Sequence, residues 1–256
     1  MKPSTAPLLE VKNLSVSLGR PRILAVDQVS LSVAQAEVLG LVGASGAGKS
    51  SVARLIAGLL TPDQGEIRYE GNHTAAMSRE QKMGIRQKIQ LIFQEPGSSL
   101  SPKRNIEQIL LEPMEHFGIG DSLSRIQTMG EVLNTVGLDA DILPRYPHQF
   151  STGQQQRIAI ARALVCEPDL LIADEAVSAL DVSIQAQILQ LLKSLQHQKG
   201  IAMLFISHDL GVIRQLADRV AVMYRGQIVE TARADDFFNQ PTHPHSRELL
   251  RIAKSA

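Results

Sequence analysis

The chain has 256 residues, with 26 basic and 26 acidic side chains, 44% hydrophobic residues and 4% aromatic ones. This length can bury the core of one large domain, with room for a sizeable insertion. The formal net charge of zero and the few aromatic side chains argue against nucleic acid as a partner. No stretch approaches the roughly 18 apolar residues of a membrane-spanning helix.

The cysteine content and the N-terminus bear on the cellular compartment. Cys166 is the only cysteine, which excludes a disulfide within the chain and suits a reducing compartment. We expect it to be a small buried apolar residue. The first residues contain no apolar stretch typical of a signal peptide. We therefore expect a soluble cytoplasmic chain that reaches a membrane only through a partner.

The first part of the chain predicts strands and one helix. Apolar residues alternate in 8–18 and 29–33, so we expect the chain to open with antiparallel strands. The nearly continuous apolar run 37–43 predicts a central strand covered on both faces. A helix is expected from 49 to 59 and a further strand at 65–71.

The middle of the chain becomes helical. The polar segment 78–88 predicts a surface helix, 89–93 predicts a strand, and 95–104 is loop-like. The segment 121–137 predicts a helix with one apolar face, and Gly137 takes the position that follows a helix end. The residues of that face are Leu123, Ile126, Leu133 and Val136.

The last part returns to alternating strands and helices. After a helical segment that ends at 165, the apolar runs 169–175 and 201–208 predict buried strands on either side of an amphipathic helix, 183–198. The segment 219–230 predicts a hairpin that turns at 225–226.

This order of elements predicts an α/β fold. We expect a mostly parallel sheet, an N-terminal antiparallel β part and an inserted helical part, all in a single domain of residues 1–256. The nucleotide-binding core would comprise 1–94 and 166–256, and the helical subdomain 95–165.

A glycine-rich stretch, GASGAGKS at 43–50, matches the phosphate-binding pattern G-x-x-x-x-G-K-[ST] between a predicted strand and a predicted helix. Its glycines let backbone N–H groups surround phosphate oxygens. Lys49 would reach the β- and γ-phosphates, and the Ser50 hydroxyl would coordinate Mg²⁺. The expected nucleotide contacts are Gly43, Ser45, Gly46, Gly48, Lys49, Ser50 and Ser51.

Two adjacent carboxylates, Asp174 and Glu175, end the predicted strand LLIADE. The ends of strands are where open α/β sheets place their ligand chemistry. One carboxylate can hold the Mg²⁺ shell, and the other can orient or deprotonate the attacking water. The sequence contains no N-K-x-D run, which argues against a GTPase.

The stretch FSTGQQQR at 150–157 places Ser151 at a predicted helix start, where its hydroxyl can accept a backbone N–H. The stretch resembles the LSGGQQQR signature of ATP-binding cassette (ABC) ATPases. The order of motifs over almost the whole chain is also similar to that family. Gln94 resembles the Q-loop glutamine, SALD at 178–181 the D-loop, and His208 in ISHD the switch histidine.

The resemblance implies a P-loop (RecA-like) fold, ATP and Mg²⁺ as cofactors, and a head-to-tail pair of cassettes. It implies catalytic roles for Glu175, His208 and Gln94, with Ser50, Gln94 and Asp174 around the metal. The signature residues of one cassette would contact the ATP held by the other, because a helix N-terminus attracts phosphate. The residues implied on that side are Ser151, Gly153, Gln154 and Asp181.

Two positions depart from the family pattern. Thr152 replaces the first signature glycine, and we expect it to be tolerated because it follows the predicted N-cap and is already helical. Leu18 stands about where the family carries an aromatic residue that stacks on adenine, and an aliphatic contact there would bind the base less selectively.

Three further stretches resemble the peptide/nickel importer subfamily: IQLIFQEPGSSLSP, DEAVSALD and PTHPHSRELL. DEAVSALD is similar to the second ATPase of nickel importers, which favours uptake of nickel or a metal chelate; a di- or oligopeptide importer is the alternative. An exporter cassette and a non-transport ABC protein are less favoured. His243 and His245 in the last stretch fit a structural tail motif better than a metal site.

The subfamily resemblance also implies partners and a location. We expect two multi-span permeases and a second ATPase subunit, either a paralogue or another copy of this chain. A periplasmic or lipoprotein substrate-binding protein would act indirectly, and the chain would lie at the cytoplasmic face of the membrane.

Overall fold

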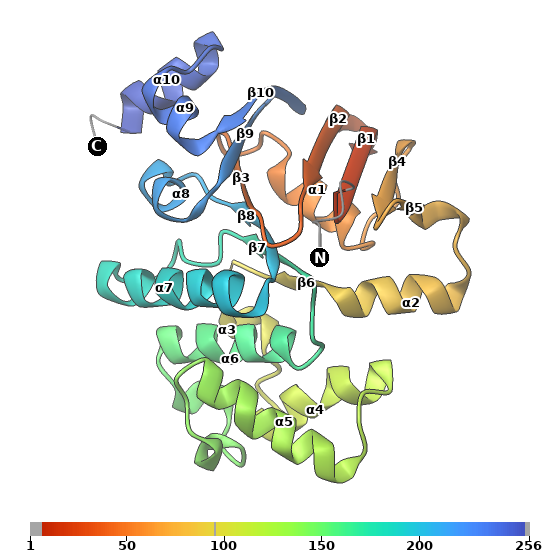
Figure 1. Ribbon diagram of the computed structural model, residues 1–256, viewed down its shortest axis with the longest axis vertical. Coiled ribbons are helices and arrows are strands. Elements are labelled where there is room, and N and C mark those ends of the chain that lie inside the picture. The colour runs from red at the N-terminus through yellow and green to blue at the C-terminus, as the bar shows by residue number, and fades with distance from the viewer. Residues whose placement is uncertain (1–6, 95, 254–256) are drawn as a thin grey trace.

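A computed structural model describes residues 7–94 and 96–253. The chain forms two sheets and a group of helices that extends from one of them (Figure 1). No helix in the described part of the chain is long and apolar enough to cross a membrane. The predicted fold class is confirmed.

The N-terminal sheet is antiparallel, as predicted, with the strand order β2-β1-β4-β5. Its strands are β1 (Leu9–Leu18), β2 (Ile23–Val33), β4 (Gln64–Tyr69) and β5 (Asn72–His73). The second strand was predicted to begin at residue 29, but β2 begins six residues earlier, at Ile23. The register between β1 and β2 shifts, and Gln28 has a φ of 47°, so the apolar alternation is interrupted where the strand continues.

The second sheet has the order β10-β9-β3-β8-β7-β6 and is parallel except for the β9–β10 pair. Its strands are β3 (Val38–Val42), β6 (Ile89–Ile92), β7 (Leu170–Asp174), β8 (Ala202–Ile206), β9 (Arg219–Tyr224) and β10 (Gln227–Arg233). The β9–β10 hairpin turns at Arg225 and Gly226, as the sequence predicts, and both residues have positive φ.

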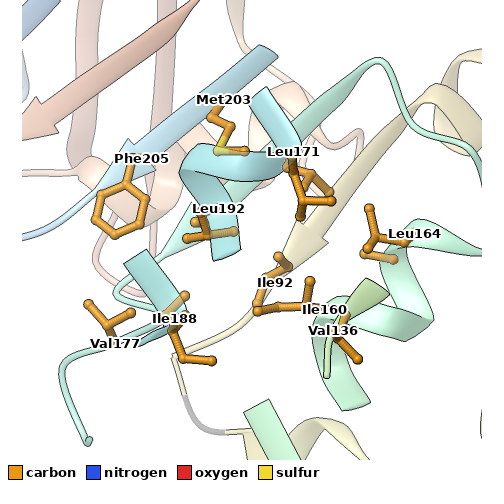
Figure 2. Close-up of a cluster of buried hydrophobic side chains, with 14 of the residues drawn as sticks. Ile92, Val136, Ile160, Leu164, Leu171, Val177, Ile188, Leu192, Met203 and Phe205 are labelled. Carbon is orange, nitrogen blue, oxygen red and sulfur yellow. The ribbon is translucent and has the colours of Figure 1, made fainter. Parts of the chain in front are cut away.

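The parallel strands are buried on both faces, which explains their continuous apolar sequences. Leu39, Leu41 and Leu204 belong to a core shared with the N-terminal sheet. Met203 and Phe205 point the other way, into a core built with the helices (Figure 2). The carboxyl ends of β3 and β7 therefore belong to a layer that is packed on both faces.

The helices differ in length from the prediction at several points. They are α1 (Lys49–Ile56), α2 (Arg79–Lys88), α3 (Pro96–Ser99), α4 (Ile106–Phe117), α5 (Ser122–Thr135), α6 (Thr152–Leu164), α7 (Val182–Lys199), α8 (Leu210–Leu216), α9 (Ala234–Asn239) and α10 (Pro244–Ala253), with 3-10 turns at Thr74–Ala76, Ala140–Ile142 and Pro147–Gln149. Helix α1 ends before residue 59 because Gly58 has a φ of 69°. The segment predicted as a loop after residue 94 contains α3.

Helices α3 to α6 form the lower part of the molecule in Figure 1. The prediction of the buried face of α5 is partly wrong. Leu133 and Val136 are buried as expected, but Leu123 and Ile126 are exposed. Successive residues of an α-helix are rotated by about 100° around its axis. At this rotation Met129 and Val132 lie on the same face as Leu133 and Val136 and are also buried, whereas Leu123 lies on another face. Gly137 follows the helix end with a φ of 73°, as predicted.

Candidate functional site

The glycine-rich loop joins the carboxyl end of β3 to the start of α1, and Gly48 is the N-cap of that helix. Lys49 is only 6% exposed. Its ammonium group donates hydrogen bonds to the carbonyl oxygens of Gly43, at 2.8 Å, and Ala44, at 3.0 Å. The Lys49 side chain therefore folds back into the glycine-rich loop, where two backbone carbonyl dipoles stabilise its positive charge.

Two glycines of the loop are required by the strands behind it. A Cβ at Gly43 would lie 2.3 Å from the carbonyl oxygen of Met223 in β9. A Cβ at Gly48 would lie 2.3 Å from the carbonyl oxygen of Ala25 in β2. Both positions also have positive φ, as does Gly46. The loop is thus pressed against β9 and β2, a contact that its own sequence does not reveal.

Ser50 and Asp174 come together although they are far apart in sequence. The Ser50 hydroxyl lies 3.1 Å from Oδ1 of Asp174, and Asp174 is 8% exposed. Burial is the main cause that raises the pKa of Asp174; the Ser50 hydrogen bond opposes it and the neighbouring Glu175 adds to it. A hydroxyl beside a desolvated carboxylate is a set of hard oxygen donors, which fits Mg²⁺.

Glu175 follows the end of β7 with a φ of 51°, in the left-handed region that a glutamate rarely occupies. Its N–H donates to the carbonyl oxygen of Ile206, which ties it to the end of β8. Its carboxylate lies 3.3 Å from Nδ1 of His208. The strained backbone is therefore held by a neighbouring strand, and it places the carboxylate beside the imidazole.

The lysine and the two carboxylates influence one another. Burial is the main cause that lowers the pKa of Lys49, and the charges of Glu175 and Asp174 act in the opposite direction. The structure therefore brings Lys49, Ser50, Asp174, Glu175 and His208 to one region, at the ends of β3, β7 and β8. A site with one cation and two carboxylates, in which Lys49 and Asp174 are buried, can hold a phosphate–metal pair and accept a proton from water.

The signature stretch begins α6 with a capping box. The Ser151 hydroxyl accepts from the N–H of Gln154 at 3.3 Å, and the Gln154 side chain accepts from the N–H of Ser151 at 3.1 Å. Thr152 is the first residue of α6 and Gly153 the second, so the expectation that Thr152 is helical is confirmed. An open cavity of about 440 Å³ lies beside Ser151, Gly153 and Gln154 and is lined further by residues of α6 and α7.

The remaining predicted residues are placed as follows. Gln94 comes after β6 and is exposed, and Asp181 is the exposed N-cap of α7 without a side-chain cap bond. Neither has a hydrogen bond or ion pair to Lys49, Ser50, Asp174 or Glu175 among the contacts of the described residues. Ser45 and Gly46 are exposed in the loop, and Ser51 lies in the first turn of α1.

The residues that support the P-loop from behind could not be predicted from the sequence. Gly226, at the β9–β10 turn, donates its N–H to the carbonyl oxygen of Ala47 at 3.0 Å. Met223 and Ala25 cover Gly43 and Gly48. These contacts join segments far apart in the chain, so no local pattern could have revealed them.

The sequence matches a family model and individual proteins that all concern ABC transporters or ATP-binding proteins of transport systems. The family model described as "ABC transporter" matches residues 26–178. A putative oligopeptide transport ATP-binding protein, YkfD of Bacillus subtilis (strain 168), is 43% identical over 248 residues, which cover 95% of this chain and 75% of YkfD. The oligopeptide transport ATP-binding protein OppF of Streptococcus mutans is 42% identical over 247 residues, 95% of this chain and 80% of OppF.

Solved structures agree with the fold. The ATP-binding cassette MJ0796, in a dimeric post-hydrolysis state bound to ADP and phosphate, has a TM-score of 0.79 and 29% identity, covering 88% of this chain and 98% of that one. The structure of cbiO1 from Clostridium perfringens, part of the ABC transporter complex cbiONQ, has a TM-score of 0.81 and 25% identity, covering 97% and 95%.

Proposed function

This chain belongs to the ABC transporter family and is an ATPase coupled to transport, and from that premise we propose that it energises the uptake of peptides. The observation that carries the proposal is the similarity to oligopeptide transport ATP-binding proteins over 95% of the chain. The DEAVSALD stretch favoured nickel in the sequence, but the names of these relatives favour the peptide alternative.

We propose that the P-loop binds the phosphates of ATP. The carbonyl oxygens of Gly43 and Ala44 accept hydrogen bonds from Lys49 and compensate its charge. When ATP binds, Lys49 would exchange these hydrogen bonds for contacts with the β- and γ-phosphates. Ser50 and Asp174 would hold Mg²⁺, with Gln94 as a further ligand. The bound metal would neutralise phosphate charge as the γ-phosphoryl group leaves.

Glu175 is proposed as the general base. Its carboxylate would take a proton from water while the water oxygen bonds to the γ-phosphorus and the bond to the β-phosphate oxygen breaks, which yields ADP and phosphate. His208, 3.3 Å from that carboxylate, would orient it and donate to the γ-phosphate.

The signature residues are proposed to act on the ATP of a second cassette. Ser151, Gly153 and Gln154 stand at the N-terminus of a helix of 13 residues, and the partial positive charge of a helix N-terminus attracts phosphate. Their cavity is lined by residues from α6 and α7 and the segment after α5, so a phosphate there would come from outside the chain's own P-loop. Asp181, at the start of α7, would lie at the same interface.

We propose two multi-span permeases as membrane partners, a binding protein that delivers the peptide, and a location at the cytoplasmic face of the membrane. The test is uptake by the reconstituted transporter, with this chain, its second ATPase and the permeases in vesicles. A labelled oligopeptide and Ni²⁺ would be offered separately, and Lys49→Ala serves as the inactive control. ATP-dependent peptide uptake is expected; uptake of Ni²⁺ without uptake of any peptide would contradict the proposal.

A further inference from the structure

A buried carboxylate anchors the C-terminal segment 241–246. Glu230 in β10 is only 8% exposed. Its two oxygens accept from the N–H groups of Thr242, at 2.8 Å, and His243, at 2.9 Å. Burial acts to raise the pKa of Glu230, but the nearby Ser246 hydroxyl and the hydrogen bonds from the N–H groups of Thr242 and His243 outweigh it and lower that pKa. The carboxylate therefore stays charged and fixes the path of the segment.

The same segment touches β9, the strand that leads to the hairpin turn at 225–226. The His245 ring packs on the ring of Tyr224, with centroids 4.1 Å apart and planes inclined at 38°. The N–H of His245 donates to Nδ1 of His243 at 3.2 Å, which orients the two histidines. Tyr224 is the last residue of β9, so the aromatic pair lies directly before the hairpin turn.

The β9–β10 hairpin turn forms a hydrogen bond with the P-loop. Gly226 donates its N–H to the carbonyl oxygen of Ala47 at 3.0 Å and accepts from the N–H of Asp27 at 2.8 Å. In a planar trans peptide the C=O and the following N–H point in opposite directions. With the Ala47 carbonyl held by the hairpin, the N–H of Gly48 is directed away from it.

We propose that Tyr224 and His245 are positioning residues for the nucleotide. They act through the Gly226–Ala47 hydrogen bond, which fixes the orientation of the Ala47–Gly48 peptide in the P-loop. Glu230 supports them by holding 241–246 in place. The inference rests on ATP binding at the P-loop and adds to it a role for a C-terminal segment that is remote from the loop in sequence.

The first test measures ATP affinity of the full chain by calorimetry, together with its Tm. His245→Ala removes the ring, and His245→Tyr keeps one; His116→Ala is the matched control, because His116 also pairs with an aromatic neighbour, Phe117, but on α4. We expect His245→Ala to weaken ATP binding about three- to tenfold, the factor that an aromatic pair contributes. His245→Tyr should restore affinity, and His116→Ala should leave it unchanged. Equal affinity in His245→Ala and wild type, with only a lower Tm, would overturn the proposal.

The second test measures amide exchange in the wild-type chain and in one variant, Glu230→Gln. By linkage, ATP must stabilise the segment that stabilises its site. Amide exchange at Gly226, Thr242 and His243 should therefore slow when ATP is added to the wild-type chain, and Glu230→Gln should reduce this protection. Unchanged exchange at 242 and 243 in a chain that binds ATP would overturn the proposal. A wild-type chain without any ATP binding would instead count against nucleotide binding itself.

Discussion

Gly153 and Ile184 are in such close contact that a Cβ at 153 would lie 2.6 Å from Cγ2 of Ile184. The signature glycine therefore lets the start of α6 pack on α7. Since the φ of Gly153 is not positive, space rather than backbone conformation requires the glycine.

Gly153→Ala is expected to destabilise the chain by about 1–3 kcal/mol, because an extra methyl group forces neighbours apart. Ile184→Ala should remove most of this cost. The measurement is the free energy of unfolding in a double-mutant cycle of the two changes. Additive effects would show that the methyl group clashes with something other than Ile184.

Ser151→Ala should lower both stability and activity. The lost cap costs about 1 kcal/mol, and the hydroxyl is proposed to contact the partner's ATP. Ser78→Ala is the matched control, since Ser78 and Gln81 form the same capping box at the start of α2. We expect similar Tm losses for the two variants, and a loss of hydrolysis in the assembled transporter for Ser151→Ala alone. Equal hydrolysis by both would assign Ser151 a capping role only.

Thr152→Gly should change hydrolysis by less than about threefold, or roughly 0.7 kcal/mol. Thr152 is already in the first turn of α6 and is exposed, so the glycine relieves no strain. The assay uses the full complex with Glu175 of this chain disabled, so that only the partner's site reports. A gain of tenfold or more would mean that Thr152 weakens the signature.

Glu175→Gln should slow ATP turnover by about 10²- to 10⁴-fold while ATP still binds, as expected for loss of a general base. Glu167→Gln is a suitable control, because Glu167 also has a φ of 51°. Turnover and ATP affinity are measured with the assembled transporter. Near-normal turnover in Glu175→Gln would show that Glu175 is not the general base.

Asp174→Asn should stabilise the nucleotide-free chain at pH 7. The pKa of Asp174 is raised in the folded state by burial, so its charge costs stability at a pH above that pKa. The gain in Tm over wild type should shrink as the pH falls through the raised pKa and vanish below the unfolded value. The same variant should lose Mg²⁺-dependent hydrolysis. A lower Tm for Asp174→Asn at pH 7 would contradict this account.

Local signals predicted much of the fold. The continuous apolar runs located β3, β7 and β8, the Arg225–Gly226 pair located the hairpin, and Ser151 marked the start of α6. These features depend on residues next to one another, which a single sequence contains in full.

Features that depend on tertiary contacts were missed or wrong. The exposure of Leu123 and Ile126 is decided by where α5 meets its neighbours, and the pattern of α5 alone placed the buried face incorrectly. The hydrogen bond from Gly226 to Ala47, and the stacking of His245 on Tyr224, join remote segments in the same way. Among the predicted site residues, Ser50 and Asp174 meet at strand ends, as do Glu175 and His208, whereas the contacts that support the P-loop could be found only in the structure.

The position of β3 in the sheet has a consequence for biosynthesis. The strand that carries the P-loop lies between β8 and β9, where Val38 pairs with Met203 and Leu39 with Arg219. During translation the P-loop leaves the ribosome long before either neighbour, and chains emerge at roughly 5–20 residues per second. A nascent chain thus lacks the carbonyl of Met223 and the N–H of Gly226 that support the loop. Competence to bind ATP should therefore arise only after β9 and the hairpin turn at 225–226 have been synthesised.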